Sequence, residues 1–207
     1  MSPSREILKK IPFCEPWFSA SYAESVRKQV LSGWMGPGPA TVAFGEAISR
    51  HVSARYCVLT ISGTLALSVA AKALGLEVGD EILVPAYGVV STINAFASFG
   101  LSPRLVDIER GTGCLSPKAL RERIRPQTRA VCFVNFSGYA GPDLLEVRSM
   151  AEECGIFLIE DAACAFGNRF QGRFAGTFGH VGTYSFSIPK IITTGQGGAV
   201  VTDTARY

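Results

Sequence analysis

The sequence predicts an α/β fold in which a mainly parallel β-sheet is sandwiched between layers of helices. Short apolar runs alternate along the chain with segments of helical period, which is the order of strands and helices in such folds. Most of these runs are separated by a helix, the connection that parallel strands need. The chain has 207 residues, 47% of them hydrophobic, and is therefore long enough to bury one sizeable core.

The elements follow one another regularly from residue 56 onward. Strands are expected at 56–61, 81–84, 104–107, 130–134, 156–160, 183–186 and 199–202. Helices are expected between them at 65–74, 89–99, 117–124 and 144–154. Residues 170–182 contain no convincing helix, so the last strands are expected to be joined differently, and an antiparallel strand remains an open alternative there.

Residues 1–55 are expected to form an N-terminal arm with helices, and residues 56–207 the sheet domain. The arm has helical segments at 22–31 and 41–52, separated by a stretch that holds Gly33, Gly36, Pro37, Gly38 and Pro39. Glycine and proline at this density interrupt regular structure. The arm packs either on the sheet domain or on a partner chain.

Composition excludes several classes of function. Twenty Lys and Arg stand against 17 Asp and Glu, so neither nucleic-acid binding nor a membrane-surface role is supported. No apolar run approaches the roughly 20 residues of a membrane-spanning helix, so we expect neither membrane insertion nor export. The six cysteines form no CxxC pair and several lie in apolar segments, which indicates a reducing, cytoplasmic location.

Lys190 is the strongest catalytic candidate. It follows an apolar strand and precedes the glycine-rich segment 193–198. A lysine side chain has an ordinary pKa of about 10.4, and partial burial lowers that pKa and frees the amine to attack a carbonyl, as Schiff-base chemistry requires. The alternative is a solvated lysine in a turn.

Two further corners carry residues suited to a ligand. Ser62, Gly63 and Thr64 lie between a strand and a helix, where free amides favour a phosphate; ordinary capping of the helix by Ser62 or Thr64 is the alternative. Asp161 closes a strand and needs a positive partner, either a protonated heterocyclic nitrogen or an arginine. The small residues at 162–167 leave space for a flat ring.

Other ligand classes lack their motifs. The chain contains no GxGxxG after its first strand and no GxxxxGK[ST], so dinucleotide and P-loop sites are not expected. The only histidines, His51 and His180, have no cysteine or acid at ligand spacing. We therefore expect neither a metal site nor a Ser/His/Asp triad, and assign both histidines structural roles.

The sequence resembles the DegT/DnrJ/EryC1/StrS aminotransferases, pyridoxal-phosphate (PLP) enzymes of fold type I that mostly aminate nucleotide-linked keto sugars. Four motifs carry the resemblance in order: 62–64 with Ala66 and Leu67, 79–81 with Val84 and Pro85, 160–163, and 185–190 with 193–198. The resemblance extends from about Gly33 to the last residue. It implies the large, PLP-binding domain of that fold.

The resemblance also implies roles for single residues. Lys190 would form the Schiff base with PLP and shuttle a proton, and Asp161 would keep the pyridine nitrogen protonated. Gly63, Thr64 and Ser185 would hold the phosphate. The full expected cofactor site is Ser62, Gly63, Thr64, Val89, Asp161, Cys164, Ser185 and Lys190.

Three positions depart from the family pattern. Family members usually carry a stacking aromatic residue where this chain has Val89, and Tyr87 is a candidate substitute. They usually carry Gln or His where this chain has Cys164, and Glu is common at the position of Gln196. The first two departures would each weaken the hold on the cofactor by ~1 kcal/mol.

The implied function is transfer of an amino group, typically from glutamate, to a keto sugar in polysaccharide or secondary-metabolite assembly, at a homodimer interface. Family chains are nearly twice as long, and this one ends at Tyr207 without the small C-terminal domain. The main alternative is therefore a truncated, non-catalytic relative that keeps the fold and at most binds PLP. Family deoxygenases replace the lysine with histidine, so Lys190 argues against dehydration or deoxygenation. A cofactor-free α/β binding module is the remaining alternative.

Overall fold

The computed structural model describes residues 12 and 14–207. The contacts divide the chain into two units, one up to Met35 and one spanning Gly36–Tyr207. Helix α1 (Ala20–Leu31) belongs to the first unit, begins after Ser19, whose side chain accepts a hydrogen bond from the amide of Tyr22, and has no buried residue. Helix α2 (Pro39–Val52), which the sequence pattern placed in the arm, belongs to the larger unit.

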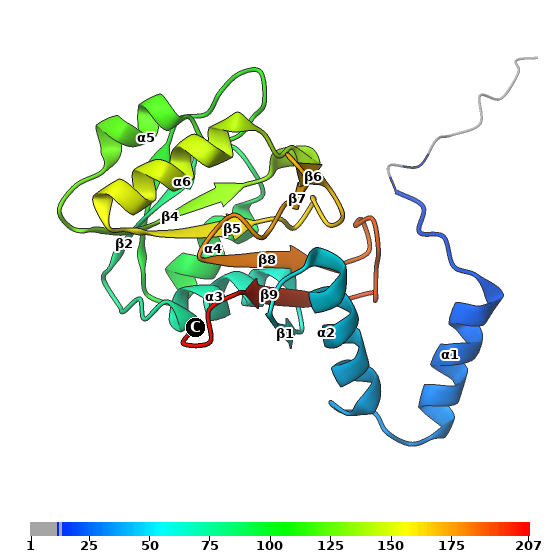
Figure 1. Cartoon of the computed structure of the whole chain (residues 1–207). Helices are drawn as coiled ribbons and strands as arrows, with labels where there is room; N and C mark the ends of the chain where they lie inside the picture. The colour runs from blue at the N-terminus through cyan, green and yellow to red at the C-terminus, as the bar shows by residue number, and fades with distance from the viewer. Residues whose placement is uncertain (1–11, 13) are drawn as a thin grey trace, which may run out of the picture. The chain divides into compact units, whose positions relative to one another are not determined.

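The larger unit is built on a seven-stranded sheet in the order β1-β9-β8-β5-β4-β2-β3 (Figure 1). Strand β9 pairs antiparallel with both of its neighbours, β1 and β8, and the remaining pairs are parallel. A mainly parallel sheet is therefore confirmed, and the open alternative of an antiparallel strand is realised in β9. The strands are β1 (Tyr56–Thr60), β2 (Glu81–Pro85), β3 (Ser102–Val106), β4 (Thr128–Val134), β5 (Phe157–Asp161), β8 (Val181–Ser185) and β9 (Gly198–Thr202).

Helices cover both faces of the sheet (Figure 1). Helices α3 (Gly63–Ala73) and α4 (Val90–Ser98) pack on one face, and α5 (Pro117–Arg123) and α6 (Pro142–Cys154) on the other. Each presents an apolar stripe at helical spacing, for example Leu144, Val147 and Ala151 of α6, which are buried with Phe133 and Leu158 of the sheet. A third cluster joins α2 to β8 and β9.

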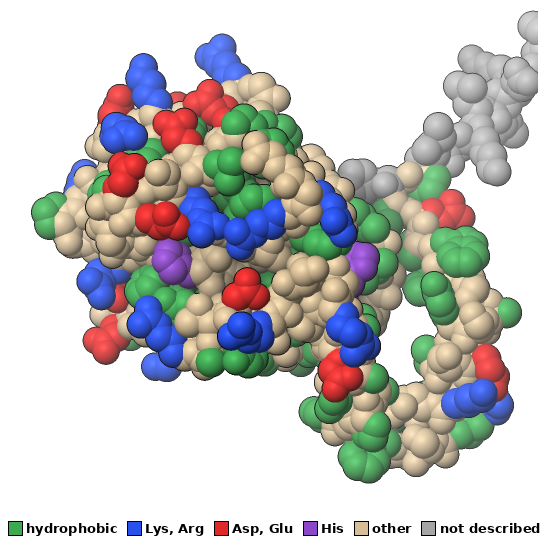
Figure 2. Space-filling view, viewed as in Figure 1, with side chains coloured by type: hydrophobic (Ala, Val, Ile, Leu, Met, Phe, Trp, Pro, Cys, Tyr) green, Lys and Arg blue, Asp and Glu red, His purple; other side chains and the backbone are tan. Residues whose placement is uncertain are grey.

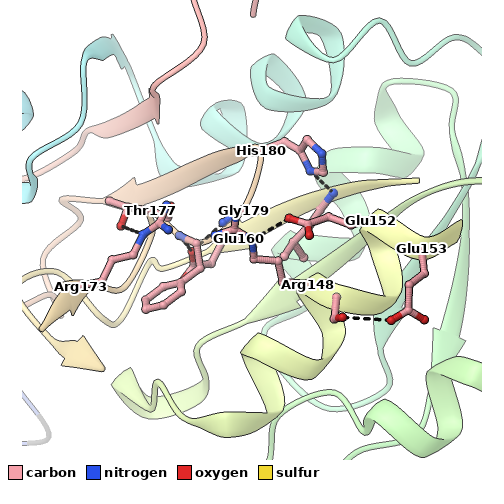
Figure 3. Close-up of polar contacts among 11 residues, drawn as sticks. Arg148, Glu152, Glu153, Glu160, Arg173, Thr177, Gly179 and His180 are labelled. Carbon is pink, nitrogen blue, oxygen red and sulfur yellow. Dashed lines mark hydrogen bonds and ion pairs between the residues drawn. The ribbon is translucent and has the colours of Figure 1, made fainter. Parts of the chain in front are cut away.

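The connection between β5 and β8 is a short hairpin, β6 (Arg169–Phe170) and β7 (Arg173–Phe174), rather than a helix. The buried carboxylate of Glu160 holds the segment that follows: it accepts hydrogen bonds of 2.7 Å from the amides of Gly176 and Phe178, and one of 3.3 Å from Gly179 (Figure 3). Burial raises the pKa of Glu160, and these amides partly offset that rise. This anchor fixes the backbone that enters β8.

The loops that follow β1, β2, β4, β5 and β8 gather at the carboxyl ends of the parallel strands, the edge where sheets of this kind bind ligands. The loop after β4 contains a short 3₁₀ helix, η1 (Phe136–Gly138), which the sequence pattern did not predict. Among the described residues, no helix is both long and apolar enough to cross a membrane.

Candidate active site

A cavity of about 370 Å³ opens at the carboxyl ends of the strands. It brings together all the residues that the sequence and the resemblance singled out as a cofactor site: Ser62, Gly63, Thr64, Val89, Asp161, Cys164, Ser185 and Lys190. They come from the loops or strand ends of β1, β2, β5 and β8. The cavity is thus formed by segments that are far apart in the sequence and end at the same edge of the sheet.

Asp161 is buried at the end of β5. Its Oδ2 accepts a hydrogen bond of 2.9 Å from Thr92 Oγ1, and its Oδ1 one of 3.1 Å from the amide of Ala163. Burial raises the pKa of this carboxyl, while the two hydrogen bonds and the positive charge of Lys190 act in the opposite direction. Within the described part of the chain no arginine or lysine forms an ion pair with Asp161, so the purely structural alternative of an arginine partner is not realised.

Thr92 is a site residue that sequence reasoning missed. It lies in the first turn of α4, is buried, and directs its hydroxyl to Asp161 across the cavity. A threonine in a helix of apolar character carries no local signal for this contact. Only the sheet order, which sets β2 two strands from β5, brings the two residues together.

The corner between β1 and α3 combines capping with a close approach to β8. Ser62 caps the helix, because its Oγ accepts a 3.1 Å hydrogen bond from the amide of Leu65. The amides of Gly63 and Thr64 lie in the first turn, where no intrahelical acceptor reaches them. A Cβ added to Gly63 would lie 2.7 Å from Ser185 Cβ, so a larger residue does not fit there. The capping alternative therefore holds for Ser62, and the corner still presents amides and the Ser185 hydroxyl to the cavity.

Lys190 is half-buried in the loop after β8. Its Nζ donates a hydrogen bond to Cys164 Sγ at 3.0 Å, and its backbone amide donates one of 3.1 Å to the carbonyl of Ser187. The loop folds back on β8, since the amide of Thr194 donates to the carbonyl of Phe186. These bonds hold the amine of Lys190 inside the cavity.

The three departures from the family pattern, Val89, Cys164 and Gln196, all line the cavity as well. Val89 lines it, with 62% of its surface exposed. Tyr87 is not among the lining residues; its ring packs against Phe136, with ring centroids 4.7 Å apart. The aromatic side chain that faces the cavity in this region is therefore Phe136 rather than Tyr87.

The two histidines have structural surroundings. The ring of His51 stacks on Phe166, with centroids 5.2 Å apart. His180 Nδ1 accepts a hydrogen bond of 2.9 Å from the amide of Leu158 (Figure 3), and burial lowers the pKa of its ring. Neither residue lines the cavity that contains Lys190.

Residues 18–206 match the model of the DegT/DnrJ/EryC1/StrS aminotransferase family. Among solved structures, the chain is similar to an aminotransferase from Psychrobacter cryohalolentis, with 29% identity over 93% of this chain and 50% of that one and a TM-score of 0.88. It is also similar to the aminotransferase TlmJ from Streptoalloteichus hindustanus, with 32% identity, 94% and 54% coverage and a TM-score of 0.88. A third is the E. coli GDP-4-keto-6-deoxy-D-mannose-3-dehydratase with bound hydrated PLP, with 27% identity, 94% and 51% coverage and a TM-score of 0.87.

The chain spans about half the length of these solved relatives, and the matched half contains the entire sheet and the cavity at its carboxyl edge. The family match covers nearly the whole chain, and the fold agrees with it. The chain belongs to the DegT/DnrJ/EryC1/StrS aminotransferase family.

Proposed function

We propose that this chain binds PLP in the cavity at the carboxyl ends of its strands and uses Lys190 to transfer an amino group to a keto sugar. The family depends on PLP, and one relative was solved with that cofactor and acts on a GDP-linked keto sugar, as its description states. The observation that carries the proposal is the convergence of a half-buried amine, a buried carboxylate and a helix N-terminus on one cavity.

The residues present suit three polar groups of PLP: the pyridine nitrogen, the phosphate and the aldehyde. Asp161 is buried and has no ion-pair partner among the described residues, so it suits a protonated pyridine nitrogen. The amides of Gly63 and Thr64, with the hydroxyl of Ser185, suit the phosphate. Lys190 lines the cavity from the loop after β8 and suits the aldehyde.

Bound PLP supplies an electron sink for charge that develops on the substrate carbon. The protein supplies the groups around it. Asp161 would hold the proton on the ring nitrogen, because a carboxylate in a poorly solvated site stabilises a neighbouring cation strongly. Lys190 Nζ would accept and return the proton that moves between the carbons of substrate and cofactor.

Val89 and Cys164 would flank the ring more weakly than the residues usual in the family. A valine presents less surface to a ring than an aromatic side chain, and a thiol is a poorer hydrogen-bond partner than Gln or His. Each substitution would cost ~1 kcal/mol of cofactor affinity. The proposal therefore expects weak cofactor binding together with intact chemistry at Lys190.

For the intact protein we propose a homodimer in the cytoplasm with glutamate as donor and a nucleotide-linked keto sugar as acceptor. Apolar side chains are exposed in the loop that holds Lys190; Ile191, for instance, has 69% of its surface exposed. Such residues beside a cavity suit cover by a second subunit. The runner-up function is a relative that keeps the fold and binds PLP without transfer. One solved relative is described as a dehydratase. The resemblance implies a histidine in place of the lysine in family deoxygenases, so Lys190 argues against that reaction here.

The experiment measures the first half of the transfer. Protein loaded with PLP is mixed with L-glutamate, and 2-oxoglutarate released in a single turnover is quantified. We expect about one equivalent per occupied site, none with Lys190→Ala, and an unchanged yield with Lys118→Ala, which alters an exposed lysine of α5. Protein that binds PLP but releases no 2-oxoglutarate would support the non-catalytic alternative.

A further inference from the structure

The contact between Cys164 and Lys190 has chemistry of its own. The two residues follow β5 and β8, which are adjacent parallel strands, so the sheet places their loops side by side. The sulfur of Cys164 lies 3.0 Å from the amine nitrogen of Lys190. That separation is close to the 3–3.5 Å at which bound groups react readily.

The backbone holds both partners in place. The amide of Ala165, next to Cys164, donates a 2.9 Å hydrogen bond to the carbonyl of Ala162, and the amide of Lys190 donates one of 3.1 Å to the carbonyl of Ser187. The two turns therefore fix the approach of sulfur and nitrogen. Cys164 is also exposed, so a small oxidant reaches its thiol.

The other cysteines of the larger unit are less suited to reaction with an oxidant and then with a lysine amine. Burial raises the pKa of Cys57 to about 11 and also raises the pKa values of Cys114 and Cys132, which keeps these thiols protonated. Cys154 is exposed at the end of α6. Among the cysteines of residues 36–207, only Cys164 has a lysine amine at hydrogen-bond distance.

We propose that a peroxide converts Cys164 and Lys190 into a reversible sulfenamide link, a covalent bond between Sγ and Nζ. In the first step the thiol of Cys164 loses its proton and the thiolate attacks hydrogen peroxide: the S–O bond forms, the O–O bond breaks, and hydroxide leaves, giving a sulfenic acid. The hydroxide takes up the proton that the thiol released and becomes water. In the second step the neutral amine of Lys190 attacks that sulfur: the S–N bond forms, the S–O bond breaks, and the departing hydroxide takes the amine proton as water.

The link is reversed by thiols. One thiol attacks the sulfur of Cys164, forms a mixed disulfide with it and releases the amine of Lys190. A second thiol then attacks the mixed disulfide, which frees the thiol of Cys164 and joins the two reductant molecules in a disulfide. The consequence for activity rests on the proposed function, because the link occupies the same amine that would hold PLP. Oxidation would switch off cofactor loading, and bound PLP would protect Lys190 from the link.

The test treats the full 207-residue chain with hydrogen peroxide and maps its peptides by mass spectrometry. We expect one cross-linked species joining the peptides of Cys164 and Lys190, two hydrogen atoms lighter than the two peptides together, which disappears after dithiothreitol. It should form equally in Cys154→Ser, and be absent from Cys164→Ser and Lys190→Ala.

Oxidation of Cys164 to sulfenic or sulfinic acid without any cross-link, in protein whose circular dichroism is unchanged, would overturn the inference. A second measurement separates it from the proposed function: unoxidised protein is incubated with PLP and reduced with borohydride. A link without a pyridoxyl label on Lys190 would support this inference and contradict the proposed function, and a label without a link would do the reverse.

Discussion

At the scale of single residues, Asp161 is the group on which the account depends most. Its carboxylate is taken out of water at the end of β5 and, among the residues that the structure describes, receives two hydrogen bonds, from Thr92 and from the amide of Ala163. The effect of burial on the pKa of this carboxyl exceeds that of the two hydrogen bonds, because the pKa is raised above its ordinary value. A carboxylate left without a charged partner destabilises the empty site and favours any cation that enters it.

Replacing Thr92 with valine should raise the pKa of Asp161 further, because the charged form loses one of its hydrogen bonds. A hydrogen bond to a charged group contributes about 1.5–3 kcal/mol, so we expect PLP affinity to fall roughly 10-fold or more. Thr92→Ser keeps the hydroxyl and should retain most of the affinity. Titration of the apo protein with PLP measures both variants; equal affinity of Thr92→Val and the unaltered chain would contradict the role given to Thr92.

Asp161→Asn should stabilise the protein that lacks PLP. The pKa of the Asp161 carboxyl is raised above 3.8 in the folded chain, so the folded chain binds a proton at this carboxyl more tightly than the unfolded chain does. The folded chain therefore loses stability as pH rises through the folded-state pKa of Asp161. At pH 7 the asparagine variant should be more stable by about 0.5–2 kcal/mol, the size of a usual trade-off between stability and function. Urea unfolding at pH 7 and below pH 4 tests this: the gain should vanish at the lower pH, and a less stable variant at pH 7 would show that the sign is wrong.

Among the helices and strands, the sequence predicted those that a periodic pattern of apolar residues marks. The seven strands of the sheet and the six helices expected along the chain are all present, because short apolar runs and helical stripes are local signals. The hairpin of β6 and β7 escaped prediction, since strands of only two residues show no periodic pattern. The segment after the hairpin is held by a carboxylate of another strand, Glu160. Thr92 escaped for a related reason: its partner lies 69 residues away.

Glu160 should be worth more to stability than any surface acid. Glu160→Ala leaves the amides of Gly176, Phe178 and Gly179 without their acceptor in a buried region, and we expect a loss of about 3 kcal/mol or more. The matched control is Glu153→Ala, an exposed acid of α6, which should change stability by less than about 0.5 kcal/mol. Chemical denaturation at pH 7 compares the two, and equal effects would contradict the anchoring role of Glu160.

At the scale of the whole molecule, apolar surface is exposed in both units. Figure 2 shows hydrophobic side chains at the surface of the sheet unit and of the N-terminal unit. Along α1, Tyr22, Val26 and Val30 recur every four residues and are each more than half exposed. A stripe of this kind on one helix face is suited to contact with another surface, as the proposed homodimer requires.

A charge on that stripe should weaken self-association. Val26→Glu places a carboxylate in the middle of the apolar face of α1, and we expect the dimer dissociation constant to rise at least about 10-fold, because a buried charge without a partner is costly. Ser21→Glu adds the same charge to another side of the helix and should leave association unchanged. Sedimentation velocity over a range of concentrations measures both, and identical behaviour would exclude α1 from the interface.

The residues of the site were predictable where a local sequence pattern marks them, and not where they depend on contacts between distant segments. Lys190, Asp161 and the 62–64 corner were identifiable because each follows an apolar strand and belongs to a motif. Their meeting in one cavity was expected in part, because the carboxyl ends of parallel strands lie at the same edge of a sheet, whereas the strand order came from the structure. The contact of Lys190 with Cys164 depends on the conformation of two loops, and no local pattern carries that information.

Lys190 is the residue that we expect to hold PLP, and a covalent label locates the bond between them. Apo protein is incubated with PLP, reduced with borohydride, digested and analysed by mass spectrometry, with Asp161→Ala and Lys118→Ala treated in parallel. The account predicts a single stoichiometric pyridoxyl label on Lys190, retained in Lys118→Ala and strongly reduced in Asp161→Ala. Labels scattered over surface lysines, or none on Lys190 in folded protein, would contradict it.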